Sequence, residues 1–433
     1  MEQVKHSVEI IYNVDDVPEG YKKYAYALQH ILAMFAANVT LPILVVGAVG
    51  LNSQQGTLLI QSAMLMAGVA TLIQVQGFKK IGSRLPIVMG TSNAFISTVM
   101  AIVTQFGIGA ALGASFIGGL FETILGNYLD KVKSIFTPLV TGVVVMTIGI
   151  TLIPVGIRQA AGSRTEIGIG SPINWFLSLL VIGVIILCYR LDHKVLKSAS
   201  ILIGIITGYV VAMMLNQIDF SVVNNASWIS FVTPFAFKWE FHLAAIVSML
   251  FMYLATTVET VGDASALTVV AKQRESTPEE NKGAILADGL ASSLAAIFNA
   301  FPNTSYTQNI GVVNLTGVFS TVVVKIGAVI LIIMSLFPKL AAVILIVPEP
   351  VLGGATLVTF SMVFVSGVSL VMRTPMTSRN MLIIALSVGL GVGLSLVPEA
   401  LSLVPLSLRL MLTSGVVPSA LLAIGLDYFL PTT

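Results

Sequence analysis

The sequence is poor in charge and in cysteine. Only 10% of its 433 residues are charged, whereas soluble domains carry about 25%, so an ordinary soluble globule is excluded. A net charge of +2 offers no basic surface for nucleic acid. The single cysteine, Cys188, rules out an intramolecular disulfide. The chain also has no zinc-binding His-Glu-x-x-His motif and no cofactor motif, so we expect no enzyme activity and no bound metal or cofactor.

Apolar stretches are abundant, since 56% of the residues are hydrophobic. Stretches of roughly 17–22 residues can cross the hydrocarbon core of a bilayer. The polar, mixed-charge residues 1–24 predict a cytoplasmic N-terminal segment and no cleavable signal peptide. We predict an all-α polytopic membrane protein with fourteen spans at 25–49, 57–77, 91–106, 108–127, 134–155, 173–189, 198–216, 242–267, 283–300, 305–317, 319–338, 351–372, 380–397 and 407–429.

Two helix-breaking segments occupy corresponding places in the two halves. Residues 86–93 read PIVMGTSN and residues 302–309 read PNTSYTQN, an offset of 216 residues (302 minus 86). We call them the first and the second broken segment. A second pair, 138–142 and 350–354, has nearly the same spacing. Matching interruptions in two apolar halves are typical of transporters built from repeats, where freed backbone groups can hold a solute at mid-membrane.

Seven spans in each half would insert the second half upside down relative to the first, giving two inverted repeats. Lysine and arginine concentrate in the segments that this topology places inside, as the positive-inside rule requires. We therefore expect both termini in the cytoplasm. The expected location is a plasma membrane, the inner membrane of a bacterium, with membrane lipid around the spans.

Ionisable residues inside spans are costly, so each requires an explanation. Glu259 and Asp263 are spaced i, i+4 and share one face of the eighth predicted span, with Asp288 on the next span. These acids are interpreted as functional, although a structural pair satisfied by neighbouring hydroxyls is the alternative. His30 in the first span is equally compatible with packing and with a coupling role. Near span ends, Glu122 is predicted to reach the headgroups, and so is Asp427.

Glu259 and Gln308 together have the chemistry to read a flat heterocycle. Gln308 offers one acceptor and two donors, and an ionised Glu259 offers acceptors. The starts of two half-helices would add backbone N–H groups. A medium of low dielectric favours the neutral form of a carboxyl group, so protonation could be coupled to solute binding. The proton would be the coupling ion.

Residues 308–317, QNIGVVNLTG, resemble the signature of the nucleobase–ascorbate transporters (nucleobase–cation symporters). That signature is Gln, Glu or Pro, then Asn, any residue, Gly, any four residues, Thr, and Arg, Lys or Gly, and every defined position fits. Supporting stretches cover nearly the whole chain: 29–35, 258–263, 286–289 and 348–354. The resemblance is greatest to bacterial xanthine and uric acid permeases.

The resemblance implies a core domain (25–127, spans one to four; 242–338, spans eight to eleven) and a gate domain (134–216, spans five to seven; 351–429, spans twelve to fourteen). Short antiparallel strands in spans three and ten would form the substrate site. The family further implies a homodimer and an elevator movement of the core against the gate.

The resemblance also implies roles for single residues. Glu259 would hydrogen-bond the nucleobase and Gln308 would contact it from the tenth span. Asp288 matches an acid important to function in xanthine permeases, and His30 matches a histidine that affects affinity. The full predicted substrate site comprises Glu259, Gln308, Asn309, Ser92, Asn93, Phe95 and Ala37, and the predicted proton-coupling set is Glu259, Asp263, Asp288 and His30.

One departure concerns the substrate. Relatives commonly have Ser-Phe in the third span, whereas this chain has Ser92 and Asn93. A stacking face is lost unless Phe95 supplies it, and Asn93 could contact the base or merely brace Asn309. We expect proton-coupled uptake of xanthine, with uric acid or uracil as alternatives. An anion transporter or a channel of related fold is the competing class, and Glu259 argues against a naked anion.

Overall fold

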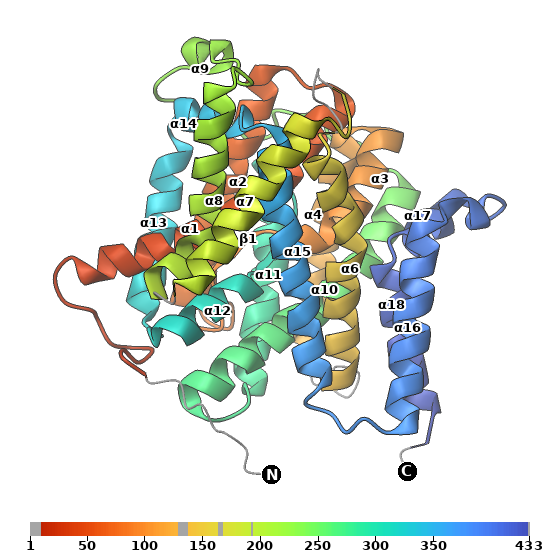
Figure 1. Ribbon diagram of the computed structural model, residues 1–433. Coiled ribbons are helices and arrows are strands. Elements are labelled where there is room, and N and C mark those ends of the chain that lie inside the picture. The colour runs from red at the N-terminus through yellow and green to blue at the C-terminus, as the bar shows by residue number, and fades with distance from the viewer. Residues whose placement is uncertain (1–9, 129–136, 163–167, 192–193, 432–433) are drawn as a thin grey trace.

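The computed structural model describes residues 10–128, 137–162, 168–191 and 194–431, which form a helical body with one two-stranded sheet (Figure 1). Residues 1–9 of the predicted N-terminal segment and 134–136 of the fifth predicted span lie outside the described residues. The main elements are α1 Lys22–Val49, α2 Ser53–Gln76, β1 Met89–Thr91, α3 Ile96–Phe106, α4 Ile108–Asn127, α6 Pro138–Ala160, α7 Pro172–Arg190, α8 Lys194–Met214, α9 Ser221–Asn225, α10 Leu243–Lys272, α11 Pro278–Ile297, β2 Asn303–Ser305, α12 Thr307–Thr316, α13 Thr321–Ser335, α14 Pro338–Leu345, α15 Glu349–Val371, α16 Ser378–Leu396, α17 Leu406–Thr413 and α18 Val416–Phe429.

Eight of the described helices are long and apolar enough to cross a membrane, and a ninth span results if α13 and α14, bent by 89°, are taken together. Three further apolar helices are shorter, at Asn93–Phe106, Ala199–Met214 and Val416–Phe429. The prediction of a mostly helical membrane protein is confirmed. The described residues contain fewer full-length spans than the fourteen that the sequence predicted. Several of the predicted apolar stretches fold as shorter or bent helices.

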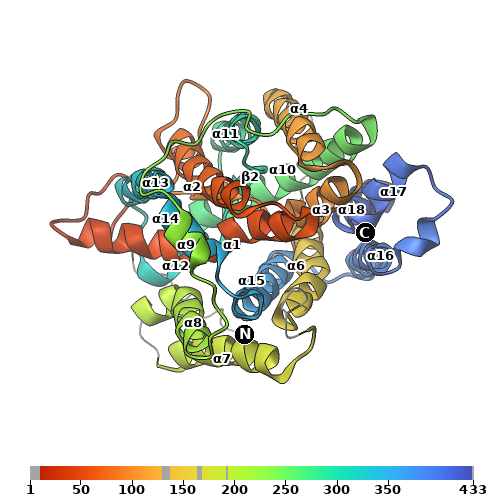
Figure 2. The same cartoon turned by 90° about the horizontal axis from the view of Figure 1, so that it is seen from above.

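The helices form two groups, and α1 and α10 of one group contact α6, α8, α15 and α17 of the other. Seen from above, α1–α4 lie with α10–α13 on one side, while α6 and α15 lie between α7/α8 and α16–α18 (Figure 2). The most extensive helix pairs join distant parts of the chain: α6 with α15, α4 with α11 and α2 with α13. Each pair takes one helix from each half of the sequence.

Small residues permit these close pairings. A Cβ atom on Gly149 of α6 would lie 2.3 Å from the backbone nitrogen of Phe364 on α15. A Cβ on Gly119 of α4 would lie 2.6 Å from the carbonyl oxygen of Gly289 on α11. Since helices in lipid gain little from the hydrophobic effect, close backbone packing through small residues stabilises them instead.

The two broken segments meet as strands β1 and β2. The strands pair antiparallel in the register Met89↔Ser305, Gly90↔Thr304 and Thr91↔Asn303. Each strand leads into a helix, α3 after β1 and α12 after β2, so the starts of two half-helices face the middle of the protein. Each buried strand has one edge without a strand partner, which would leave backbone groups unpaired in an apolar surrounding.

Side chains from neighbouring helices satisfy those edges. Asn38 of α1 accepts from the Thr91 amide (2.9 Å), and the Thr71 hydroxyl of α2 accepts from the Met89 amide (2.9 Å). Gly90 is required between them, because a Cβ there would come within 2.4 Å of the Tyr306 ring and 2.8 Å of Asn38. The first broken segment is therefore held by its backbone.

Three sequence interpretations are wrong in detail. The last predicted span, 407–429, is two helices, α17 and α18, because the chain turns at Gly415 with φ +74°. Asp427 does not reach for headgroups but pairs with Arg379 at 2.9 Å. Glu122 is only 1% exposed, since α4 is covered at that position by α10 and α11.

The polar connector between α10 and α11 is ordered by charge. Arg274 and Lys272 both bind Glu280 (2.7 and 2.8 Å), and Glu280 also caps α11 through the Thr277 amide. Partial burial opposes the charged form of Glu280, but the hydrogen bonds from Arg274, Lys272 and the Thr277 amide outweigh it and lower the pKa of the carboxyl to about 2. Ion pairs and a helix cap therefore fix the short connector between α10 and α11, the two helices that carry the buried acids.

Candidate functional site

Asp263 of α10 binds the second broken segment with both of its carboxyl oxygens. The hydroxyl of Ser305 donates to Oδ2 at 2.6 Å, and that of Thr307 donates to Oδ1 at 2.8 Å. Ser305 ends β2 and Thr307 begins α12, so one carboxyl group spans the break between strand and helix. The position of Gln308, the next residue, follows from this contact.

Asp288 of α11 makes the matching contact one residue earlier on β2. Its Oδ2 accepts from Thr304 at 3.2 Å and from Thr260 of α10. Ser292, one turn further along α11, exchanges two 3.0 Å hydrogen bonds with the backbone of Asn303. Two acids and one serine therefore hold the whole of β2 against α10 and α11.

His30 of α1 lies beside the signature asparagine. The Asn309 amide donates to the His30 carbonyl at 3.0 Å and contacts its Nδ1 at 3.1 Å. An amide NH₂ only donates, so Nδ1 must be the unprotonated nitrogen and His30 carries its proton on Nε2. His30 therefore fixes α12 against α1 in its neutral form.

A set of buried polar atoms near these contacts has no hydrogen-bonding partner among the described residues. In native proteins such atoms are rare and require an explanation, such as a ligand that completes them. The predicted site contributes four of them: Ser92 Oγ, Asn93 Oδ1, Glu259 Oε2 and Asn309 Oδ1. They come from both broken segments and from α10.

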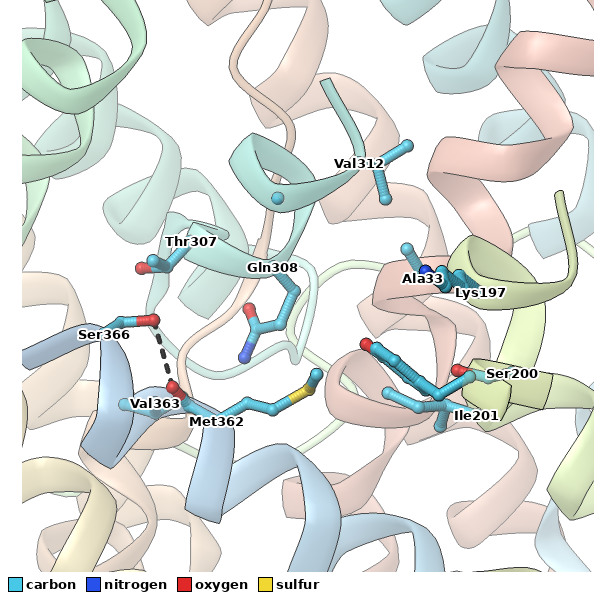
Figure 3. A pocket seen from close by; sticks show the side chains of 12 residues that line it. Ala33, Lys197, Ser200, Ile201, Thr307, Gln308, Val312, Met362, Val363 and Ser366 are labelled. Carbon is cyan, nitrogen blue, oxygen red and sulfur yellow. Dashed lines mark hydrogen bonds between the residues drawn. The ribbon is translucent and has the colours of Figure 1, made fainter. Parts of the chain in front are cut away.

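Gln308 lines a cavity of about 150 Å³ between α12 and the helices α8 and α15. Figure 3 shows its amide pointing from α12 toward Met362 of α15, with Ser366 beside Thr307 and Ser200 on the opposite wall. Glu259 does not line this cavity, although it lies one turn from Asp263 on α10. In this conformation, Gln308 and Glu259 therefore lie in different surroundings.

The remaining predicted residues are packed. The Phe95 ring is fully buried and packs on Tyr253 of α10, with ring centroids 4.7 Å apart. It presents no open face to the polar atoms described above. Ala37 lies in a buried apolar cluster with Tyr306 and Val88.

Sequence reasoning missed the hydroxyl residues that bind the acids. Thr304, Ser305 and Thr307 donate to carboxyl groups, and Thr260 donates from α10. A run of short polar side chains (NTSYT) after a proline, in a chain of mean hydropathy +0.95, was an available signal. Tyr306 was also missed, and its hydroxyl donates to the Thr91 carbonyl at 2.7 Å, joining the two broken segments.

Comparison with known proteins places the chain in a family. A family model described as the Permease family, which covers xanthine and uric acid permeases, matches residues 22–400. The chain belongs to the nucleobase–ascorbate transporter family. It is therefore a multi-pass membrane permease and not an enzyme.

Individual relatives agree along nearly the whole chain. The permease is 37% identical over 408 residues to the xanthine permease of Bacillus subtilis, covering 94% of this chain and 93% of the relative. It is 37% identical over 407 residues to the uric acid permease PucK of the same organism, covering 94% of both.

A solved structure agrees in fold. The transmembrane domain of the cyanobacterial bicarbonate transporter BicA superposes with a TM-score of 0.59 at 16% identity, covering 91% of this chain and 98% of that domain. At this identity the likeness concerns the fold alone.

Proposed function

We propose that this permease takes up an oxidised purine nucleobase, xanthine, across the plasma membrane by proton symport. The observation that carries the proposal is the set of four open polar atoms, on Ser92, Asn93, Glu259 and Asn309, where two half-helices meet. A purine edge presents alternating N–H and C=O groups, and these atoms could complete their hydrogen bonds on it. Relatives named xanthine and uric acid permeases support the same substrate class.

Uptake of labelled xanthine by cells expressing the permease tests the substrate. We expect accumulation that excess xanthine abolishes and that collapse of the proton gradient stops. Competition by urate, uracil, hypoxanthine, guanine and adenine ranks the alternatives. Stronger competition by urate than by xanthine would reassign the substrate within the family. Insensitivity to the proton gradient, with dependence on sodium, would refute proton coupling.

Two substitutions test the site. Glu259→Gln and Gln308→Ala are expected to abolish or severely weaken uptake while leaving the protein in the membrane. Matched controls are Glu399→Gln and Gln217→Ala, which change exposed residues and should leave uptake unchanged. Full transport by both site variants would dismiss the proposed site.

The architecture proposed for this mechanism is fourteen spans in two inverted repeats. In such repeats the second span (α2) is equivalent to the ninth (α11), and the fourth span (α4) is equivalent to the eleventh (α13). The packing of α2 on α13 would then be repeated as α11 on α4, and α6 on α15 would map onto itself. All three pairs are prominent in the fold.

The proposed movement is an elevator, with the core domain (25–127 and 242–338) sliding against the gate domain (134–216 and 351–429), in a homodimer. Support comes from Gln308, whose cavity is walled by α1 and α12 of the core and by α7, α8 and α15 of the gate. A core that moved against the gate would open or close that cavity.

A cross-link tests the movement. A Cβ on Gly262 of α10 would lie against the Thr141 side chain of α6, 2.7 Å from its Cγ2, so cysteines at these two positions would be neighbours across the contact between core and gate. In a Cys188→Ala background, oxidation of the double variant Thr141→Cys/Gly262→Cys should stop uptake, and reduction should restore it. Each single variant under the same oxidant is the control. Undiminished uptake by fully cross-linked protein would refute the elevator.

A further inference from the structure

Glu122 is a buried acid that the substrate site does not use. It lies on α4, 1% exposed, against α10 and α11. The titratable groups that face it are Tyr253 of α10 and Asp288 of α11, which both interact with it electrostatically. The adjoining helix α3 carries no titratable residue. Among the described residues, no lysine, arginine or histidine forms an ion pair with Glu122.

Two buried anions that interact with each other and have no neutralising cation are costly in an apolar surrounding, because each charge loses its hydration and the two charges repel. Glu122 and Asp288 are both 1% exposed. Each has one carboxyl oxygen without a partner among the described residues, Glu122 Oε2 and Asp288 Oδ1. At least one of the two must therefore hold a proton.

The two contacts of the Thr257 hydroxyl indicate that Glu122 is the protonated acid. The Thr257 hydroxyl lies 2.8 Å from the Tyr253 carbonyl oxygen and 3.1 Å from Glu122 Oε1. A hydroxyl has one hydrogen, and a carbonyl oxygen only accepts. If Thr257 donates to the carbonyl, its contact with Glu122 requires a proton on the carboxyl group. An unpartnered Oε2 is also far less costly on a neutral acid than on a carboxylate.

Asp288 has the opposite surroundings. Its Oδ2 accepts from two hydroxyl groups, those of Thr260 and Thr304. Two donors on one oxygen suit a carboxylate. Thr304 belongs to β2, so a change of charge at Asp288 acts directly on the strand that leads to Asn309 and Gln308. Of the two acids, it is the charged Asp288 that contacts β2.

We propose that Glu122 stores the proton that Asp288 takes up during transport. The step moves one proton from the Glu122 carboxyl group to the Asp288 carboxylate, leaving a carboxylate at Glu122 that accepts from Thr257. Protonated Asp288 then accepts more weakly from Thr304 and loosens β2. This inference rests on the proposed proton symport, and it makes Glu122 a coupling residue that does not touch the nucleobase.

Glu122→Gln tests this role, because glutamine keeps the shape and hydrogen bonds of the neutral acid but cannot release a proton. Reconstituted into vesicles, the variant should exchange labelled for unlabelled xanthine at a rate near that of the unsubstituted protein. Its accumulation driven by a proton gradient should fall at least tenfold, and the pH profile of uptake should flatten. Ser115→Ala, a buried change on the same helix, should keep both exchange and accumulation.

Thr257→Val is the second variant, since it removes the hydroxyl beside Glu122 at similar volume. It should retain exchange and change the pH profile, and it decides the question if Glu122→Gln fails to reach the membrane. Unaltered accumulation and pH profile in the variant that reaches the membrane would overturn this inference alone. If the unsubstituted protein accumulates xanthine without a proton gradient, the proposed symport fails first, whatever Glu122 does.

Discussion

The two broken segments have similar sequences, with a proline ahead of short polar residues, but their polar side chains differ in how many hydrogen bonds they make. In the second broken segment nearly every polar side chain is engaged: Thr304 by Asp288, Ser305 and Thr307 by Asp263, and Asn309 by His30. In the first, the side-chain oxygens of Thr91, Ser92 and Asn93 have no partner among the described residues. Its backbone is held instead, by Asn38 and Thr71.

The two segments are therefore held in different ways. Carboxyl groups of α10 and α11 fix the second segment, so its helix α12 starts at one defined place. The first segment supplies open polar atoms beside it. The two segments differ because only the second one contacts the carboxyl groups of α10 and α11.

The largest expected effect comes from releasing the second segment. Asp263→Ala removes the acceptor of both Ser305 and Thr307, and each stranded buried group costs about 1–3 kcal/mol. Xanthine uptake should fall at least about tenfold, measured as kcat and KM in vesicles. Asp263→Asn, which keeps one acceptor oxygen, should be intermediate. Equal loss from the two variants would show that charge, and not the hydrogen bonds, holds the segment.

Asn309→Ala should have the next largest effect. It unties α12 from His30 and removes the open Oδ1 from the proposed site. The loss of one buried hydrogen-bonding group is worth about 1 kcal/mol, or roughly fivefold in affinity, read as a rise in KM. His30→Ala should weaken uptake less, since the Asn309 amide can keep its bond to the backbone carbonyl of residue 30. A larger effect of His30→Ala would give the ring a role beyond this contact.

Tyr306→Phe tests the link between the segments. The substitution removes only the hydroxyl that donates to the Thr91 carbonyl at 2.7 Å. A single hydrogen bond of this kind contributes about 0.5–1.5 kcal/mol. We expect a lower melting temperature of the purified protein and a decrease in uptake of about two- to tenfold. Unchanged melting together with unchanged uptake would mean that the strand pairing alone holds the segments.

The smallest effect on stability, and the sharpest comparison, comes from two matched serines. Ser92→Ala removes a hydroxyl without a partner among the described residues, whereas Ser305→Ala removes one bound to Asp263. Ser305→Ala should lower the melting temperature, and Ser92→Ala should leave it unchanged while altering the KM for xanthine. Destabilisation by Ser92→Ala would contradict the assignment of open polar atoms to the first segment.

Much of the broad picture could be read from the chain. Apolar length and scarce charge predicted a polytopic membrane protein, and the prolines at 86 and 302 predicted where the helices break. The i, i+4 spacing of Glu259 and Asp263 predicted a shared helix face, and the signature at 308–317 indicated the family that the comparisons show. These signals are local, since each depends on composition or on spacing within one element.

The missed features depend on contacts between elements. Glu122 near the end of an apolar stretch is indistinguishable, in sequence, from an acid that reaches the headgroups; only the packing of α4 against α10 and α11 buries it. In sequence, Phe95 was a candidate for stacking on the base, but in the structure its ring packs on Tyr253. Likewise, the donors to Asp263 and Asp288 lie 42 and 16 residues away along the chain for Ser305 and Thr304.

The chain by itself determined that this protein is a membrane permease with two interrupted halves, because hydropathy and helix breaking act residue by residue. Tertiary structure decided which acids are anchored, which are unpartnered and which face each other. The physical reason is that a buried carboxyl group takes its state from the few atoms around it, and those atoms come from helices and strands far apart in the sequence.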